Sequence, residues 1–396
     1  MGYIKNEFDV KDVRRICMIY KDFKDKKLSA LGLGAMRLPI MNGDSDGRID
    51  EEQTAKMVDY ALDHGINYFD TAYGYHDGQS EIVMGKVLGR YPRESYYLAD
   101  KFPGYDLSNM DKVESIFEEQ LKKCGTEYFD FYLFHNVYEK NIDPYMDEKY
   151  GIMEYLKKQK EAGRIRHLGF SCHGRYDTLK RFLDTYGDDL EFCQIQLNYL
   201  DWKLQDAKAK VELLNEYEIP IWVMEPLRGG KLALLSDENS EKLKACRTDE
   251  EIPAWGFRFL QSIPGVTMVL SGMSDMKQLM ENTATFAEEK PLTEEEMKVL
   301  MEVTDSMLDI LPCTACRYCT SHCPKKLDIP TLLSLYNESR FNMTIITQMA
   351  IGALPEEKRP DACIGCKSCE AVCPQMLKIS EAMRDFAEKL KQPAGL

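Results

Sequence analysis

The sequence has no apolar run long enough to cross a membrane and no excess of basic residues. Its hydrophobic stretches fall short of the roughly 18 residues that a membrane helix requires, and the chain does not open with the basic, apolar and small-residue pattern of a signal peptide. Acidic residues outnumber basic ones by 66 to 51, which gives a formal net charge of −15. These features disfavour nucleic acid and anionic membrane as partners and predict a cytoplasmic protein.

Cysteine, by contrast, is abundant and unevenly spaced. The chain has 13 cysteines, and eight of them fall in two compact runs after position 312. We do not expect disulfides, because gaps of two and three residues are the spacing of metal ligands. So many unpaired thiols also indicate a reducing compartment. The remaining five are scattered: Cys17, Cys124, Cys172, Cys193 and Cys246.

No G-x-G-x-x-G motif follows the first strand-like run, which disfavours an open, doubly wound nucleotide-binding sheet. Strand-like and helix-like segments alternate over most of the chain, and this predicts a parallel sheet closed as a (β/α)8 TIM barrel. With 44% hydrophobic and 30% charged residues, the chain has a core to bury. We expect strands at 28–39 (with its exit loop), 66–69, 96–99, 129–134, 165–170, 192–197, 221–224 and 267–270, and helices at 51–64, 80–89, 110–124, 152–162, 177–186, 207–217, 253–261 and 275–286.

Polar side chains follow three of these strand-like runs at the point where each ends. Asp70 is one, with Tyr75 five residues later in a glycine-containing loop, and Lys101 and His135 are the others. Because the carboxyl ends of barrel strands meet at one face, we expect these side chains to come together for acid–base chemistry. A lone lysine is usually solvated and a lone histidine is usually a satisfied core residue, but four such residues in this order favour catalysis.

These four residues resemble the catalytic tetrad of the aldo-keto reductases. The resemblance implies a nicotinamide-dependent oxidoreductase that interconverts a carbonyl and an alcohol by hydride transfer. Tyr75 would be the general acid, and His135 would orient the carbonyl. The ammonium of Lys101 would lower the pKa of Tyr75, while Asp70 would pair with Lys101 and hold it in place.

The same resemblance implies cofactor contacts along the rest of the barrel. Ser171 matches a residue that holds the nicotinamide, but Cys172 stands where the family has asparagine, so that contact falls to a thiol or to His173. Met224 replaces the aromatic residue that stacks on the nicotinamide. The expected contacts are Gly34, Met36, Arg37, Ser171, Cys172, Gln194, Met224, Pro226, Leu227, Gly229, Ser271, Gly272, Gln278, Glu281 and Asn282.

The resemblance leaves the choice between NADP and NAD open. Gly272 and Gln278 occupy positions at which many members have Lys and Arg for the 2′-phosphate, and neither can pair with a phosphate dianion. Either NADP or NAD is therefore expected. No flavin signature is present, although barrels can bind flavin without one.

Each cysteine run has the form C-x-x-C-x-x-C-x-x-x-C-P, which is the run of bacterial ferredoxins. Three of its thiolates hold one [4Fe-4S] cluster, and the fourth, before proline, reaches the other cluster. Zinc is the alternative, but a four-ligand zinc site leaves no role for three thiols at two-residue gaps and a fourth before proline. The expected ligands are Cys313, Cys316, Cys319 and Cys373 for one cluster and Cys363, Cys366, Cys369 and Cys323 for the other.

These patterns divide the chain into four expected parts. An extension at 1–17 has no assigned function, the barrel covers 18–290, a linker helix covers 291–311 and a ferredoxin-like domain covers 312–396. Residues 329–352 have helical spacing, so this domain resembles the helical ferredoxin modules of respiratory iron–sulfur subunits. It takes the sequence position of the loop that closes the substrate pocket in the family, so it either walls the pocket or docks elsewhere.

Barrel and clusters together resemble the iron–sulfur aldo-keto reductases of anaerobic bacteria. Nicotinamide exchanges two electrons as hydride and a cluster exchanges one, so three hypotheses remain. The protein is a reductase with structural or redox-sensing clusters, an electron-transfer component with a ferredoxin-type partner, or a nicotinamide redox sensor without turnover. The substrate is a small carbonyl compound or alcohol, and the candidate pocket residues are Tyr73, Phe102, His173 and Trp202.

Overall fold

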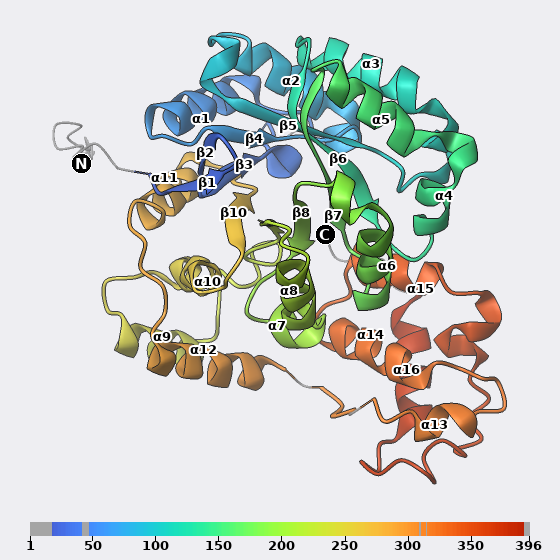
Figure 1. Cartoon of the computed structure of the whole chain (residues 1–396). Helices are drawn as coiled ribbons and strands as arrows, with labels where there is room; N and C mark the ends of the chain where they lie inside the picture. Colours follow the sequence, from blue (N-terminus) through green and yellow to red (C-terminus); the bar gives the residue numbers. More distant parts are fainter. Residues whose placement is uncertain (1–17, 42–46, 309, 314, 392–396) are drawn as a thin grey trace.

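The structure is a computed structural model that describes residues 18–41, 47–308, 310–313 and 315–391, so the expected extension at 1–17 lies outside the described residues. Eight parallel strands close into a barrel in the order β10-β3-β4-β5-β6-β7-β8-β9 (Figure 1). This confirms the predicted (β/α)8 fold. The strands are β3 (Leu31–Gly34), β4 (Tyr68–Asp70), β5 (Tyr97–Phe102), β6 (Phe129–Val137), β7 (Ile165–Cys172), β8 (Cys193–Gln196), β9 (Ile221–Met224) and β10 (Val266–Ser271).

A hairpin that the sequence did not predict precedes the barrel. β1 (Tyr20–Phe23) pairs antiparallel with β2 (Lys26–Ser29), and the first barrel strand begins only at Leu31. The expectation of a strand from residue 28 was therefore wrong at its start. The hairpin buries Phe23 in the barrel, 5.0 Å from the ring of Trp222 and 5.6 Å from that of Phe131. It thus plugs the amino-terminal end and leaves the carboxyl ends of the strands for chemistry.

Helices surround the barrel as the alternating pattern predicts. The first begins at an Asp50 N-cap, whose side chain accepts a hydrogen bond from the Gln53 amide. α9 was not predicted, because its sequence is polar and lacks an apolar stripe. The helices are α1 (Glu51–Asp63), α2 (Gln79–Leu88), α3 (Val113–Cys124), α4 (Ile142–Met146), α5 (Ile152–Glu161), α6 (Tyr176–Tyr186), α7 (Asp201–Leu204), α8 (Ala207–Glu216), α9 (Asp237–Cys246), α10 (Ile252–Gln261) and α11 (Met276–Thr285).

A helix and a small helical module follow the barrel. α12 (Glu294–Met307) starts with a capping box between Thr293 and Glu296. The module has its own apolar core, which includes Leu332, Met383 and Phe386. We call this region the cluster module. Its helices are α13 (Tyr318–Ser321), α14 (Ile329–Phe341), α15 (Ile345–Gly352) and α16 (Ile379–Lys389).

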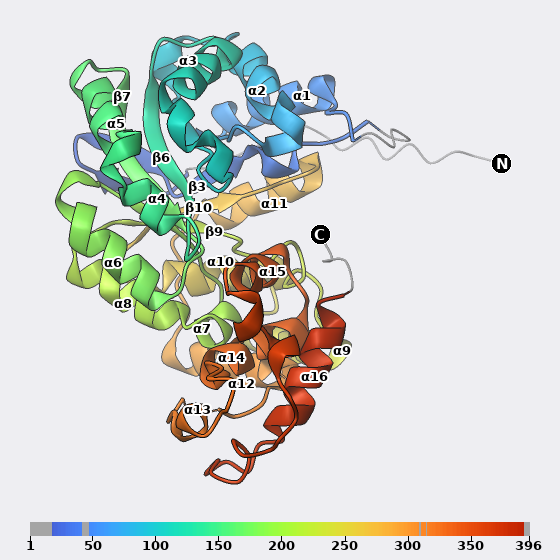
Figure 2. The same cartoon turned by 90° about the vertical axis from the view of Figure 1, so that its right-hand side faces the viewer.

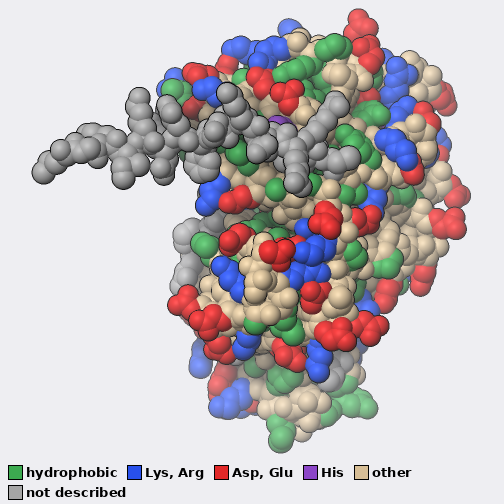
Figure 3. Space-filling model, turned by 90° about the vertical axis from the view of Figure 1, so that its left-hand side faces the viewer, with side chains coloured by type: hydrophobic (Ala, Val, Ile, Leu, Met, Phe, Trp, Pro, Cys, Tyr) green, Lys and Arg blue, Asp and Glu red, His purple; other side chains and the backbone are tan. Residues whose placement is uncertain are grey.

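The cluster module lies against one side of the barrel. Figures 1 and 2 show α14 and α15 nearest the barrel, with α13 and the cysteine-bearing loops farther from it. On the face in Figure 3, acidic and basic side chains are interspersed. None of the helices in the described ranges has the length and apolar character needed to span a membrane.

Candidate active site

Three predicted catalytic residues meet at the carboxyl end of the barrel. Lys101, in β5, places its Nζ 2.5 Å from Oδ1 of Asp70 at the end of β4 and 2.7 Å from the carbonyl oxygen of Thr71. The same Nζ lies 3.5 Å from the hydroxyl of Tyr75. His135, in β6, completes the group, with its ring centre 6.0 Å from that of Tyr75. The structure thus brings together all four side chains.

Burial governs the electrostatics of this group. It raises the pKa of Tyr75 to about 12, against the lowering effect of the Lys101 charge. The net lowering expected from the sequence is therefore wrong for this structure, although Lys101 acts in the expected direction. Burial also holds the pKa of His135 well below its usual range, and the Lys101 charge adds to this. Tyr75 is thus protonated and His135 is neutral at neutral pH.

Lys101 itself stays charged. Burial acts to lower its pKa, but Asp70, together with Tyr75 and Asp100, offsets this, and the pKa of Lys101 lies above its ordinary value. The side chain of Lys101 has no exposed surface and that of Asp70 only 4%. The pair therefore forms a fixed positive charge beside the Tyr75 hydroxyl.

Several buried polar atoms around the tetrad have no hydrogen-bond partner within the described ranges. They include Nδ1 of His135, Oδ1 of Asn136, Nδ1 of His173 and Oε1 of Gln194. A buried polar atom without a partner is costly, so such atoms gathered at a barrel mouth fit a polar ligand. Gln194 is a predicted nicotinamide contact, and its free carbonyl oxygen suits an amide donor.

The other expected nicotinamide contacts differ in where they point. Oγ of Ser171 accepts a hydrogen bond of 2.7 Å from the backbone N–H of Asn136, and Nε2 of Gln194 lies 3.6 Å from Sδ of Met224. Cys172 instead belongs to the apolar core between strands and helices, and burial raises the pKa of its thiol to about 12. The structure therefore groups Ser171, Gln194 and Met224 but turns Cys172 away from them.

Arg37 joins the expected pyrophosphate and adenosine segments. A Cβ built on Gly272 would lie 3.2 Å from Cβ of Arg37, and one built on Gly229 would lie 3.2 Å from its Nη2. Gly229 also has a φ of +65°, which favours glycine. Gly34 lies beside this segment as well, since its Cβ would stand 3.5 Å from the Ser271 carbonyl oxygen. Met36 is 52% exposed.

The segment after β10 is ordered by its own polar contacts. Asn282 is buried and donates from Nδ2 to Oγ of Ser271 at 3.2 Å, and Oε1 of Gln278 accepts from the Ser274 amide at 2.9 Å. Gln278 is exposed in the first turn of α11, and Glu281 is exposed in the second. In the loop after β9, Pro226 is buried and Leu227 is half-buried.

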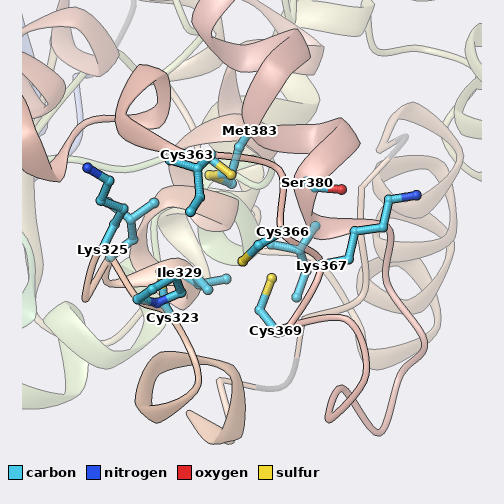
Figure 4. A pocket seen from close by; sticks show the side chains of 13 residues that line it. Cys323, Lys325, Ile329, Cys363, Cys366, Lys367, Cys369, Ser380 and Met383 are labelled. Carbon is cyan, nitrogen blue, oxygen red and sulfur yellow. The ribbon is translucent and has the colours of Figure 1, made fainter.

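The eight cysteines of the two runs line two hollows in the cluster module. Figure 4 shows the hollow lined by Cys323, Cys363, Cys366 and Cys369, in which Cys366 and Cys369 point into the same space. No three His, Cys, Asp or Glu residues in the described part of the chain are gathered closely enough to hold a single metal ion. One hollow is lined by Cys313, Cys316, Cys319 and Cys373, and the other by Cys323, Cys363, Cys366 and Cys369.

The cluster module docks at the mouth of the barrel, a question that the sequence left open. Nδ2 of Asn136 donates to Sδ of Met349 in α15 at 3.9 Å. Asn136 directly follows His135, so α15 lies beside the tetrad. A second contact joins Gln205, after α7, to Glu338 of α14 at 3.2 Å.

Sequence reasoning missed two residues of this site. Asn136 has a φ of +57°, a conformation in which asparagine is enriched, and its place directly after His135 was the available signal. Tyr105 lies in the loop after β5, with its ring centre 5.1 Å from that of His135. Of the candidate pocket residues, Phe102 packs on Tyr145 and Trp202 on Phe259, whereas Tyr73 donates a hydrogen bond to Glu119.

Comparisons with known proteins agree with this architecture. The family described as "Aldo/keto reductase family" matches residues 30–305, and "4Fe-4S dicluster domain" matches 312–378. The Glycine max protein named "Probable aldo-keto reductase 1" is 29% identical over 231 residues, 55% of this chain and 63% of its own. The "NADH-specific methylglyoxal reductase" of Escherichia coli is also 29% identical over 231 residues, 52% of this chain and 66% of its own. Both matches cover under two thirds of the relative.

A solved structure supports the fold. The aldo-keto reductase AKR11C1 of Bacillus halodurans, in its holo form, superposes with a TM-score of 0.58 at 22% identity, covering 72% of this chain and 96% of that one. The barrel match spans more than half of the chain, and the dicluster match follows it directly. This protein therefore belongs to the aldo/keto reductase family and carries a 4Fe-4S dicluster domain after its barrel.

Proposed function

We propose that this oxidoreductase interconverts a carbonyl and an alcohol with NAD(P)(H), using Asp70, Tyr75, Lys101 and His135. The observation that carries the proposal is the buried Lys101 ammonium, held by Asp70 and 3.5 Å from the hydroxyl of Tyr75. A carbonyl oxygen that takes up a proton needs a proton donor, a fixed positive charge and a hydrogen-bond donor. The protonated phenol, the fixed cation and the neutral imidazole at the barrel mouth would supply these.

The barrel residues fit a nicotinamide. Among the described residues, Oε1 of Gln194 is buried without a hydrogen-bond partner, and Gly229 and Gly272 let the side chain of Arg37 pack closely against both expected cofactor loops. When bound, the nicotinamide supplies or accepts the hydride. NADP and NAD both remain candidates, since Gln278 is exposed but uncharged and the E. coli relative is named as NADH-specific.

The protein's own residues would then handle the proton. In the reducing direction the Tyr75 hydroxyl donates its proton to the carbonyl oxygen, and Lys101 stabilises the phenolate that remains. Asp70 keeps Lys101 in position. His135, which is neutral, donates a hydrogen bond from its ring N–H to the same oxygen and so orients the substrate.

We also propose two [4Fe-4S] clusters, held by the two cysteine sets. The support is the grouping of the hollows, because each takes three cysteines from one run and the fourth from the other. A four-ligand zinc site would leave no role for three thiols at two-residue gaps and a fourth before proline. The clusters would supply one-electron redox chemistry or hold the module together.

The test is anaerobic turnover. The protein is purified without oxygen, its iron and sulfide are measured, and aldehydes, sugars and ring ketones are screened with NADPH and NADH. We expect about eight iron atoms per chain and nicotinamide oxidation that Tyr75→Phe slows by roughly 10²–10⁴-fold. Turnover that survives Tyr75→Phe unchanged would refute the assigned acid.

A second candidate function is electron transfer between the barrel and a partner protein. The observation that favours it is α14, which joins the two sites: Ile329 and Pro330 line the hollows, and Phe341 lies against Arg228 of the expected cofactor loop. NADPH and then NADH are added anaerobically, and cluster absorbance and EPR are followed. Bleaching supports this candidate; unchanged clusters that dithionite still reduces argue against it. A sensor without turnover is the third candidate, and the Tyr75 assay decides it.

A further inference from the structure

We propose that the edge of the two cysteine hollows is a docking surface for a small acidic protein that carries a one-electron iron–sulfur centre. The inference rests on the two clusters proposed above. We call this surface the cluster rim. It consists of Arg317, Tyr318, Lys325, Ile364, Lys367 and Met376.

The cluster rim faces away from the barrel. α14 begins at the hollows, where Ile329 and Pro330 are lining residues, and ends at the barrel with Phe341. At 1.5 Å per residue, the helix spans about 18 Å. Figures 1 and 2 both place α13 and the cysteine-bearing loops at the end of the molecule away from β3–β10. A protein that docks here would approach the clusters without entering the barrel mouth.

Three large apolar side chains of the cluster rim are exposed to solvent. Tyr318 is 61% exposed, Ile364 60% and Met376 86%. Cys316 and Cys366, one from each hollow, are exposed as well. In Figure 3 hydrophobic side chains lie at the lower end of the molecule, which the cluster module forms. Apolar side chains gathered beside an accessible redox site are typical of a protein interface.

The charge of the rim is opposite to that of the whole chain. The charged side chains that line the hollows are Lys325 and Lys367 at one and Arg317 at the other, with no carboxylate among the described lining residues. Arg317 lies 3.4 Å from Oδ1 of Asp328, so Lys325 and Lys367 carry most of the positive charge of the rim. Nζ of Lys358 also donates to the Lys325 carbonyl oxygen at 3.0 Å, which adds a cation behind the rim. In a chain of net charge −15, an acidic partner is attracted here and repelled by the bulk of the molecule.

These cations have a second effect, since they also offset the negative charge of a cluster bound by four thiolates. The two roles differ in what they predict. If the cations only neutralise the cluster, they change its redox potential. The rate at which an acidic carrier reduces the cluster would then depend on salt no more than the rate with a neutral carrier. Docking predicts a carrier rate that falls with salt and with charge reversal at residues that do not line a hollow.

The transfer that docking serves is one electron at a time. The reduced carrier loses one electron and is oxidised, and one [4Fe-4S] cluster of this protein gains that electron and is reduced. No proton or bond is exchanged. Two such events load both clusters with two electrons, the number carried by one hydride.

The experiment mixes anaerobic, fully loaded protein with a reduced, acidic two-cluster bacterial ferredoxin in a stopped-flow instrument. Two charge-reversed variants are compared. Lys325→Glu/Lys367→Glu changes lining residues. Lys326→Glu/Met376→Gln changes Met376 of the rim and the exposed Lys326 next to Lys325, neither of which lines a hollow. Lys122→Glu/Lys298→Glu makes the same charge change as the first variant on exposed helix positions outside the module and is the control.

We expect each rim variant to slow the second-order rate by about tenfold or more and to flatten its salt dependence, with the control unchanged. Absorbance and dithionite-reduced EPR confirm that the clusters are intact. If the lining variant loses its clusters, the Lys326→Glu/Met376→Gln variant decides. Intact clusters that reduced ferredoxin does not reduce, or rates equal to the control, would overturn the docking proposal while leaving the cluster assignment in place. Absent clusters in the unmodified protein would refute the cluster assignment instead.

Discussion

The guanidinium carbon of Arg228 lies 5.1 Å from the centre of the Phe341 ring, so the loop after β9 is held by the last residue of α14. Arg228 also pairs with the buried Asp201 at 2.8 Å. Glu338, one turn before Phe341, is buried in the same junction and feels the charges of both residues. The expected cofactor loop and the cluster module therefore share one buried charge network.

The ionisation of Glu338 is expected to make the stability of this junction depend on pH. Burial raises its pKa from 4.5 to about 7, against the lowering effect of Arg228. The folded protein thus binds more protons than the unfolded chain between pH 4.5 and 7, so its free energy of unfolding falls as pH rises through this window. The loss is about 3 kcal/mol at most. Above pH 7 it is complete.

Glu338→Gln should remove this slope. We expect anaerobic melting curves between pH 5.5 and 8 to show a falling Tm for the unmodified protein and a flatter profile for the variant. Glu357→Gln, an exposed change in the same module, is the control. Parallel profiles for Glu338→Gln and the unmodified protein would contradict the assignment.

Met349 is expected to limit the size of the substrates that the barrel mouth accepts. Its Sδ contacts Asn136 beside His135, so Met349→Ala would remove side-chain volume from the wall over the barrel mouth. We expect bulkier carbonyl substrates to gain in kcat/KM by roughly 10-fold, while the Kd of the nicotinamide changes little. Met376→Ala, which removes the same atoms at an 86% exposed position, should leave substrate preference unchanged. An identical substrate profile in both variants would place Met349 outside the pocket.

Paired cysteine variants predict which thiols share a cluster. Cys323 and Cys363 line one hollow, whereas Cys313 lines the other. Each single Cys→Ser change should lose one cluster, about half of the iron. Cys323→Ser/Cys363→Ser should then lose no more than either single variant, but Cys323→Ser/Cys313→Ser should lose both clusters. The reverse pattern would mean that each run holds its own cluster.

Lys101→Met tests the fixed charge beside Tyr75. Without the ammonium the phenolate left after proton donation is unsupported, so we expect kcat to fall by roughly 10²–10⁴-fold with little change in nicotinamide Kd. Lys122→Met, at an exposed position of α3, is the matched control. A lost Kd with preserved kcat would show that Lys101 binds cofactor instead.

Gln278→Arg tests cofactor preference. Gln278 is exposed at the start of α11, so an arginine there can reach solvent and a 2′-phosphate without displacing core atoms. We expect NADPH to bind about tenfold more tightly, because arginine pairs with phosphate in a charge-assisted contact, and NADH to be unaffected. Equal gains for both nucleotides would argue against a 2′-phosphate contact at this position.

The sequence predicted the barrel because strand and helix periods alternate along it, and it placed Asp70, Lys101 and His135 at strand ends because each follows an apolar run. It missed the hairpin, since Leu28 and Leu31 read as one strand when only local pattern is visible. It gave the wrong direction for the pKa of Tyr75, because burial depends on the complete fold. Asn136 and Met349 are 213 residues apart, and no local pattern predicts that contact.

The route of α14, from the cysteine hollows to Arg228, ties the fate of the clusters to the barrel. Ile329 and Leu333 line the hollows at one end, and at the other Phe341 packs on Arg228 of the expected cofactor loop while Glu338 accepts a hydrogen bond from Gln205. Air that strips the clusters would leave the first turns of this helix without support. Loss of the clusters to oxygen would then weaken nucleotide binding at the barrel, even though no barrel residue had reacted.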